Sequence, residues 1–166
     1  VGQFRDRLTA LLTTISDKTR GPYRVNFAAH SFGTHVLAHA LPSLPDEQRK
    51  FIGNIALMGS VLPSSFNVMS LSTIGPSAKV YNFCSIDDKI LLLNAALPLR
   101  SGLAGRVGFK GVFEGSLVEQ RFFRFGHGGY FNDLALGSTS WLGRYCVPGL
   151  LREEVPPGTH SRPRYG

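Results

Sequence analysis

Cysteine is scarce in this 166-residue chain, which has only Cys84 and Cys146. Two thiols cannot make the disulfide framework of a small secreted domain, and they form no zinc-binding pattern. Both lie in apolar segments, where we expect buried thiols that pack as small apolar side chains. The sequence therefore points away from disulfide scaffolds and zinc modules, and we expect no metal and no cofactor.

Long hydrophobic runs and a secretory signal are also missing from the sequence. Hydrophobic residues make up 43% and charged residues 17% of the chain, which is typical of a globular protein. We therefore expect a soluble, cytoplasmic protein without a membrane span. Because the chain begins with Val1, we also expect that a preceding segment has been removed.

Acidic residues are few, with 11 Asp and Glu against 18 Lys and Arg, so the formal net charge is +7. The positive residues are scattered, and their densest group is Arg152, Arg162 and Arg164 near the C-terminus. No basic run with interleaved aromatic residues is present, so we expect a solvated basic surface and no nucleic-acid partner. Nucleic-acid binding stays open as a third hypothesis, which salt-dependent retention on DNA or RNA would test.

Apolar periodicity predicts helices and strands that alternate along the chain. The helices are expected at residues 4–15, 34–41, 90–97 and 131–145, and the strands at 23–29, 51–58, 79–84 and 117–125. Strands that are apolar on both faces and alternate with helices indicate an α/β fold with a parallel sheet flanked by helices. We expect one domain over residues 1–152, a glycine-punctuated flexible segment over 102–111, and a flexible tail over 153–166.

The segment from Arg24 to Thr34 predicts a strand, a tight turn and a helix, with Ser31 at the apex of the turn. A serine hydroxyl is a poor nucleophile and must stand clear of the backbone to meet both a base and a substrate. Ala29 and Gly33 are small enough to avoid collision within such a turn. The alternative is an ordinary turn in which Ser31 is the N-cap of the helix.

This segment resembles the nucleophile elbow of the α/β-hydrolase superfamily, Gly-x-Ser-x-Gly between a strand and a helix, with Ala29 in place of the first glycine. The resemblance implies that Ser31 is the nucleophile and that the Phe32 N–H contributes to the oxyanion hole. In that family an acid and then a histidine follow the serine along the chain. Asp88, after the third strand, and His127, after the fourth, stand where this order requires them, and Asp87 remains the alternative acid.

The remaining histidines are expected to have other roles. His30 is beside Ser31, but neighbouring side chains diverge on a turn, so we do not expect it to be the base. His35 and His39 are four residues apart on one helix, a spacing that suits a metal, yet no third ligand is evident. His160 lies in the tail, where we expect it to be solvated.

The resemblance covers residues 1–150 and only the C-terminal half of a complete hydrolase fold. We therefore expect a partial fold that lacks the N-terminal strands and the loop that carries the second oxyanion donor. A central strand without a neighbour exposes its edge, so homo-oligomerisation or pairing with the missing N-terminal segment is expected.

Two functions follow from the sequence. The first is a serine hydrolase that cleaves an ester, thioester or related acyl bond of a small-molecule substrate through an acyl-enzyme. The second is a non-catalytic or truncated hydrolase-like domain that binds a partner, because a fold alone does not prove activity. The excursions at residues 61–74 and 97–113 either shape an acyl pocket or form plain surface loops.

Overall fold

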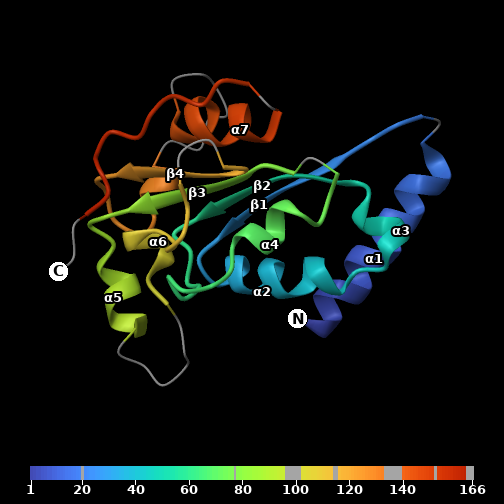
Figure 1. The fold of residues 1–166 in the computed structure, drawn as a ribbon, viewed down its shortest axis with the longest axis horizontal. Coiled ribbons are helices and arrows are strands. Elements are labelled where there is room, and N and C mark those ends of the chain that lie inside the picture. The colour runs from blue at the N-terminus through green and yellow to red at the C-terminus, as the bar shows by residue number, and fades with distance from the viewer. Residues whose placement is uncertain are drawn as a thin grey trace.

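The computed structural model describes residues 1–19, 21–76, 78–95, 102–113, 116–132, 140–151 and 153–163, and its centre is a parallel sheet (Figure 1). The sheet has four strands in the order β1-β2-β3-β4, namely β1 (Val25–His30), β2 (Ile52–Met58), β3 (Val80–Ser85) and β4 (Val118–Phe123). Every neighbouring pair is parallel. The predicted α/β class, with a parallel sheet flanked by helices, is confirmed.

Helices cover both faces of this sheet (Figure 1). Helix α7 lies on one face, and α1, α2, α4, α5 and α6 lie on the other. The helices are α1 (Gly2–Lys18), α2 (Phe32–Ala40), α3 (Asp46–Arg49), α4 (Met69–Ser72), α5 (Lys89–Ala95), α6 (Ala104–Val107) and α7 (Val147–Leu151), with short helices η1 (Leu41–Ser43), η2 (Gly129–Phe131) and η3 (Leu142–Cys146). Across the described ranges, no helix is both long and apolar enough to cross a membrane.

The central strands are buried on both faces because their side chains pack into two separate hydrophobic cores, one on each face of the sheet. In β2, Ile55 and Leu57 belong to the core beneath α1 and α2, whereas Ala56 and Met58 belong to an aromatic-rich core beneath α7. Successive strand residues point to opposite faces, so a strand covered on both sides must be apolar throughout. This is the physical basis of the continuous apolar runs in the sequence.

Strand β1 differs from the central strands because only β2 pairs with it in the described part of the chain. Its residues are half-buried or exposed, and Asn26 and Ala28 are the exposed ones. An edge strand presents unpaired backbone N–H and C=O groups that another strand can bind. Among the described residues, the sheet thus has an open edge at β1, the strand that leads into Ser31.

The glycine-punctuated segment predicted to be flexible is instead packed, and this prediction is wrong for its described part. It contains α6, and Gly102 and Gly105 lie so close to the backbones of Pro63 and Ser60 that a Cβ atom would collide there. Phe109 is fully buried in the core beneath α2, as are Val68 and Leu71 of the preceding excursion. In their described parts, both excursions therefore supply core side chains.

The predicted helix at residues 131–145 lies in part outside the described residues. In the described part, Phe131 ends η2, and helical structure continues from η3 into α7, which ends at Leu151. The helix therefore extends further toward the C-terminus than predicted. The reason is that Tyr145 and Cys146 pack with Trp141 into the aromatic-rich core between α7 and the sheet.

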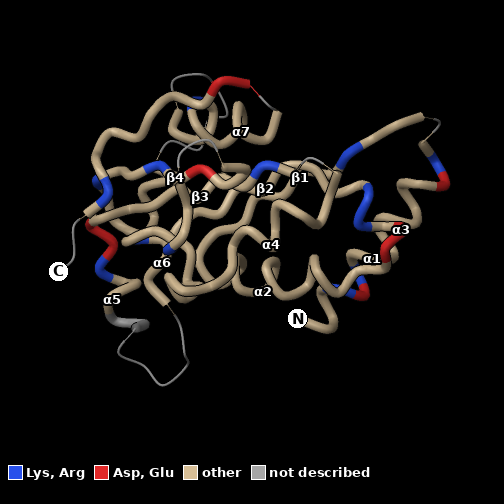
Figure 2. Tube along the Cα trace, in the orientation of Figure 1, with Lys and Arg blue, Asp and Glu red and all other residues tan. Residues whose placement is uncertain are grey.

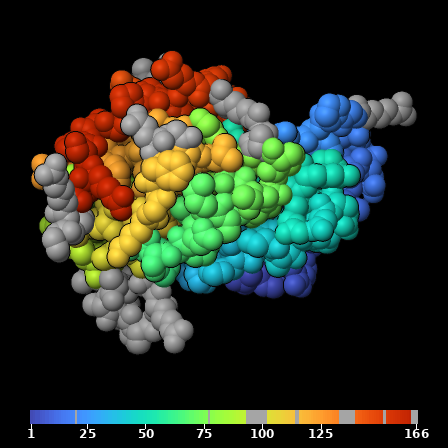
Figure 3. Space-filling model, viewed as in Figure 1, coloured from blue at the N-terminus to red at the C-terminus, as the bar shows by residue number. Residues whose placement is uncertain are grey.

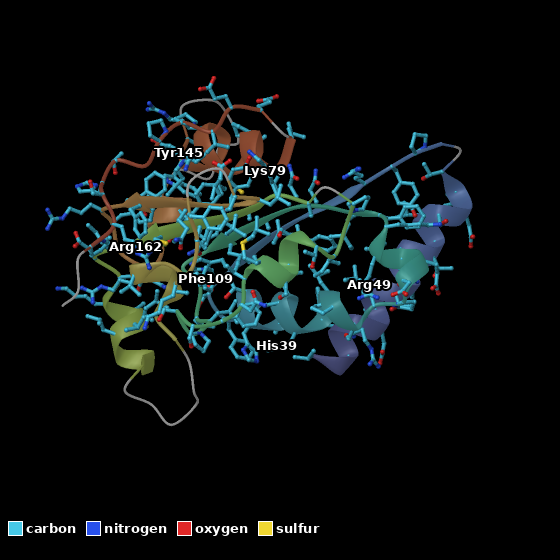
Figure 4. All side chains as sticks on the ribbon, viewed as in Figure 1. His39, Arg49, Lys79, Phe109, Tyr145 and Arg162 are labelled. Atoms are coloured by element: carbon cyan, nitrogen blue, oxygen red, sulfur yellow. The ribbon has the colours of Figure 1, made fainter. Side chains whose placement is uncertain are left out.

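The described part of the predicted tail, near the red end of the colours in Figure 3, lies on the surface of the molecule and contacts β4. His160 pairs with Phe122 in an isolated antiparallel bridge. The Arg162 guanidinium donates to the carbonyl of Phe109 at 3.0 Å, and Figure 4 shows the two side by side. The composition of this segment does not predict these contacts, because each involves a backbone group of a residue distant in the sequence.

Asn54 ties β2 to both of its neighbouring strands and to α7. Its backbone N–H donates to the Asn26 side chain, its Oδ1 accepts from the Lys79 N–H, and its Nδ2 donates to the Gly149 carbonyl. The side chain is almost fully buried. It therefore satisfies backbone groups that water does not reach.

We predict that Asn54→Ala lowers the free energy of unfolding by about 1–3 kcal/mol, because buried partners lose their hydrogen bonds. Chemical denaturation measures the effect. Asn67→Ala is the matched control, since Asn67 is exposed, and it should change the unfolding free energy by less than about 0.5 kcal/mol. Equal stability of the two variants would contradict the role given to Asn54.

Candidate functional site

Three sequence-predicted side chains meet at one edge of the sheet. Ser31 directly follows β1, Asp88 follows β3 and His127 follows β4. The strands are parallel, so their carboxyl ends, and the loops that carry these residues, lie at the same edge. The site is therefore assembled from segments separated by up to 96 residues along the chain.

The three side chains form a continuous hydrogen-bonded chain. His127 Nδ1 lies 2.7 Å from Asp88 Oδ2, and His127 Nε2 lies 2.9 Å from Ser31 Oγ. A carboxylate only accepts hydrogen bonds, so Nδ1 carries a proton, and Nε2 of the neutral ring then accepts from the Ser31 hydroxyl. Asp88 is fully buried, and the His127 side chain is only 13% exposed. This is the arrangement in which a histidine can take a proton from serine.

Ser31 has a backbone conformation that lifts its side chain out of the turn. Its φ of 54° and ψ of −128° make it the one non-glycine residue with positive φ among the described residues. Such backbone strain costs about 1–3 kcal/mol and persists where surrounding contacts enforce it. Here the Ser31 N–H donates to the Met58 carbonyl, and the Ser31 carbonyl accepts from the Thr34 N–H and hydroxyl.

Ala29 and Gly33, the two small residues beside Ser31, face each other across this turn. A Cβ built on Gly33 would lie 3.9 Å from that of Ala29, so the two positions are neighbours in space. Phe32 begins α2, and its N–H has no acceptor within the helix. Phe32 is 66% exposed, and its ring stacks on His35 with 5.5 Å between ring centroids.

Asp88 and Asp87 have different surroundings, although they are adjacent in the sequence. Asp88 Oδ1 accepts from the Leu91 N–H at 3.0 Å, so the same carboxylate caps α5 and binds His127. Asp87 is exposed and forms an ion pair with Arg124 at 3.0 Å. The structure thus brings Asp88 to His127 and leaves Asp87, the alternative acid, on the surface.

The loop that carries His127 is fixed on both sides of that residue. Before it, the Ser85 hydroxyl donates to the Phe125 carbonyl. After it, the buried Tyr130 hydroxyl accepts from the Gly59 N–H at 3.0 Å and donates to the Phe83 carbonyl at 2.9 Å. Burial raises the pKa of Tyr130 well above its ordinary value, so the hydroxyl keeps its proton. Sequence reasoning missed Tyr130, since no motif in the adjacent sequence indicates that its hydroxyl fixes the loop to β2 and β3.

The remaining histidines lie outside the hydrogen-bonded chain of Ser31, His127 and Asp88. His30 binds the backbone of His127 through its ring, which sequence reasoning did not foresee. His39 points outward from α2 (Figure 4), and its ring centroid lies 4.5 Å from that of His35. Within the described ranges, no group of three or more His, Cys, Asp or Glu side chains could hold a metal ion. His160 is exposed.

The basic residues gather nowhere into a single cluster in the described part of the chain. Figure 2 shows Lys and Arg spread along the trace, several of them beside acidic residues. Two of these pairs, Lys79 and Arg121 with Glu119, are ion pairs with 2.6 Å between nitrogen and oxygen. The net charge is therefore distributed and does not mark a second site.

Comparison with known proteins adds no further assignment. No protein-family model, no curated protein and no solved structure matches this chain.

We predict that Gly129→Ala displaces the His127 loop, because the new Cβ would collide with the Phe125 ring. We expect a loss of about 1–3 kcal/mol in unfolding free energy, measured by denaturation. Gly128→Ala is the matched control, since a Cβ at that position meets nothing within 4 Å. A Gly129→Ala protein as stable as Gly128→Ala would contradict the packing described for this loop.

Proposed function

We propose that this chain is an α/β-hydrolase-like serine hydrolase that cleaves an ester, thioester or related acyl bond through an acyl-enzyme. The observation that carries the proposal is the hydrogen-bonded chain from Ser31 through His127 to Asp88, with distances of 2.9 and 2.7 Å. The strained backbone at Ser31 and the complete burial of Asp88 support it. Such strain and such geometry are typical of nucleophile sites.

In the proposed reaction, Ser31 Oγ attacks the acyl carbon while its proton passes to His127 Nε2. Asp88 orients the ring and stabilises the imidazolium that forms. Collapse of the tetrahedral intermediate breaks the bond to the leaving group, which takes the proton from Nε2 and departs as an alcohol or thiol. A water molecule then attacks the acyl-enzyme with the same proton transfers, releasing the carboxylic acid and restoring Ser31.

The Phe32 N–H is the proposed donor to the oxyanion of the tetrahedral intermediate. It sits at the first residue of the nine-residue helix α2, where the helix dipole favours negative charge. Oxyanion holes commonly hold more than one donor, and each donor contributes about 2.7–4 kcal/mol to transition-state stabilisation. With one proposed donor, the tetrahedral intermediates of both acylation and deacylation lack the stabilisation that a second donor supplies, so we expect slow turnover in this chain.

The open edge of β1 favours a second candidate role, partner binding. Backbone groups on this edge can add a strand from a second copy of the chain or from a preceding segment. This role is compatible with the hydrolase proposal, because the edge lies alongside the elbow without involving the His127 ring. A folded protein that fails to react at Ser31 would leave partner binding as its function.

We predict that a fluorophosphonate probe labels the wild-type protein and that Ser31→Ala abolishes the labelling without loss of fold. The reason is that a serine hydroxyl needs an adjacent general base to attack phosphorus at neutral pH, and His127 stands beside Ser31. Mass spectrometry of the labelled peptide and circular dichroism measure both parts. Ser65→Ala, at an exposed serine, is the control and should label normally. Absence of labelling in a folded wild-type protein would falsify the hydrolase proposal.

We predict that Asp88→Asn slows Ser31 labelling and p-nitrophenyl ester cleavage by about 10³–10⁴-fold, because an amide no longer selects the required tautomer of His127. Asp87→Asn is the adjacent control and should change either rate by only a few fold, since Asp87 pairs with Arg124 on the surface. Both rates are measured under identical conditions. A larger loss in Asp87→Asn would assign the acid to Asp87 instead.

A further inference from the structure

We infer that His30 is a positioning residue, which holds His127 in reach of Ser31 by donating a hydrogen bond from its Nε2 to the His127 backbone carbonyl. This inference rests on the proposed function and adds a residue to that site. The His30 Nε2 atom lies 2.9 Å from the His127 oxygen. A carbonyl only accepts, so the His30 ring carries its proton on Nε2.

His30 contacts His127 and the two aromatic residues that follow it in the loop. Its ring centroid lies 4.6 Å from that of His127, 5.6 Å from Tyr130 and 5.0 Å from Phe131. The last two meet it edge to face, at interplanar angles of 65° and 87°. One side chain therefore touches His127 and both aromatic residues of η2. These contacts fix the direction in which the loop leaves β4.

His30 is also the residue immediately before the nucleophile. It ends β1, and the Ser31 N–H that follows is bound to the carbonyl of Met58 in β2. A shift of the His127 loop relative to β1 would lengthen the contact between Ser31 Oγ and His127 Nε2. Because His30 joins the two segments directly, it couples the position of the base to that of the nucleophile.

Gly59, directly after β2, lies against both imidazole rings. A Cβ built on Gly59 would lie 3.5 Å from both His30 Nε2 and His127 Cε1, and Gly59 has a φ of +54°. The backbone at this position favours glycine, and a Cβ there would stand in ordinary van der Waals contact with both rings. His30 and His127 therefore pack together against the backbone at Gly59.

The charge state of His30 fits this role. Burial lowers the pKa of His30, and the neighbouring His127 acts in the same direction, whereas the hydrogen bond to the His127 carbonyl and the Asp88 carboxylate oppose the shift. The ring is therefore neutral at pH 7. A neutral neighbour does not repel the imidazolium that His127 becomes during the proposed reaction.

Substitution of His30 by an apolar and an amide residue tests the inference. His30→Leu removes the donor, and His30→Gln keeps an amide N–H in a similar position. Because small displacements of a catalytic group cost up to about 100-fold in rate, we expect His30→Leu to slow fluorophosphonate labelling of Ser31 by about 10–100-fold. His30→Gln should recover most of that rate. His39→Leu, at an exposed histidine of α2, is the control and should label as the wild type does.

A second measurement does not depend on activity. The His127 Nδ1 proton, bound to Asp88, gives a low-field proton NMR resonance when it exchanges slowly. We expect this resonance in the wild type and in His30→Gln, and we expect it to broaden in His30→Leu. If His30→Leu does not fold, His30→Asn replaces it, because its shorter amide cannot reach the carbonyl.

The outcomes separate the two proposals. An unchanged labelling rate and an unchanged resonance in His30→Leu would overturn the positioning role, as would a His30→Gln protein no better than His30→Leu. If the folded wild type does not label, the hydrolase proposal fails, and the NMR resonance alone decides the role of His30. Broadening in His30→Leu with recovery in His30→Gln supports that role in either case.

Discussion

The parallel alignment of β1 to β4 places the carboxyl end of every strand at one edge of the sheet, and the candidate site depends on this alignment. His30 pairs with Met58 and Met58 with Phe83, so β3 and β4, which end at the paired residues Ser85 and Phe123, run two residues past the end of β1. The loops after β1, β3 and β4 begin along the same edge. Each has only a few residues to cross before its side chain meets the others.

Within the site, backbone strain positions Ser31, and burial protects the hydrogen bond between Asp88 and His127. The positive φ at Ser31 directs its hydroxyl away from the backbone. In an ordinary helix N-cap, the serine hydroxyl would instead bind a backbone N–H of the first turn. Complete burial of Asp88 excludes water from its bond with His127, while its second oxygen satisfies the first turn of α5. Tyr130 and His30 hold the loop between these two fixed points. Loss of any of these contacts would free one of the side chains Ser31, Asp88 and His127 to move away from the other two.

Most of the sheet could be predicted from the sequence because its strands have a strong local signal. Apolar runs bounded by glycine, proline or serine located all four strands to within a few residues. The segment around Gly102 and Gly105 was misjudged, because glycine is common both in flexible loops and where two backbones come into contact. Only the position of the facing backbone, at Ser60 and Pro63, distinguishes these cases. The helix end near Tyr145 was misplaced for a similar reason, since its aromatic partners come from β4 and Trp141.

The sequence by itself determined the α/β class and the turn at Ser31, because both depend on residues close together in the chain. The order of serine, acid and histidine along the chain can also be read without knowledge of their positions in space. The tertiary structure decided which of two adjacent aspartates meets His127, since their side chains leave the same turn in different directions. It also decided that His30 binds the His127 backbone. That contact joins residues 97 positions apart, and no local pattern encodes a hydrogen bond between a ring nitrogen and so distant a carbonyl.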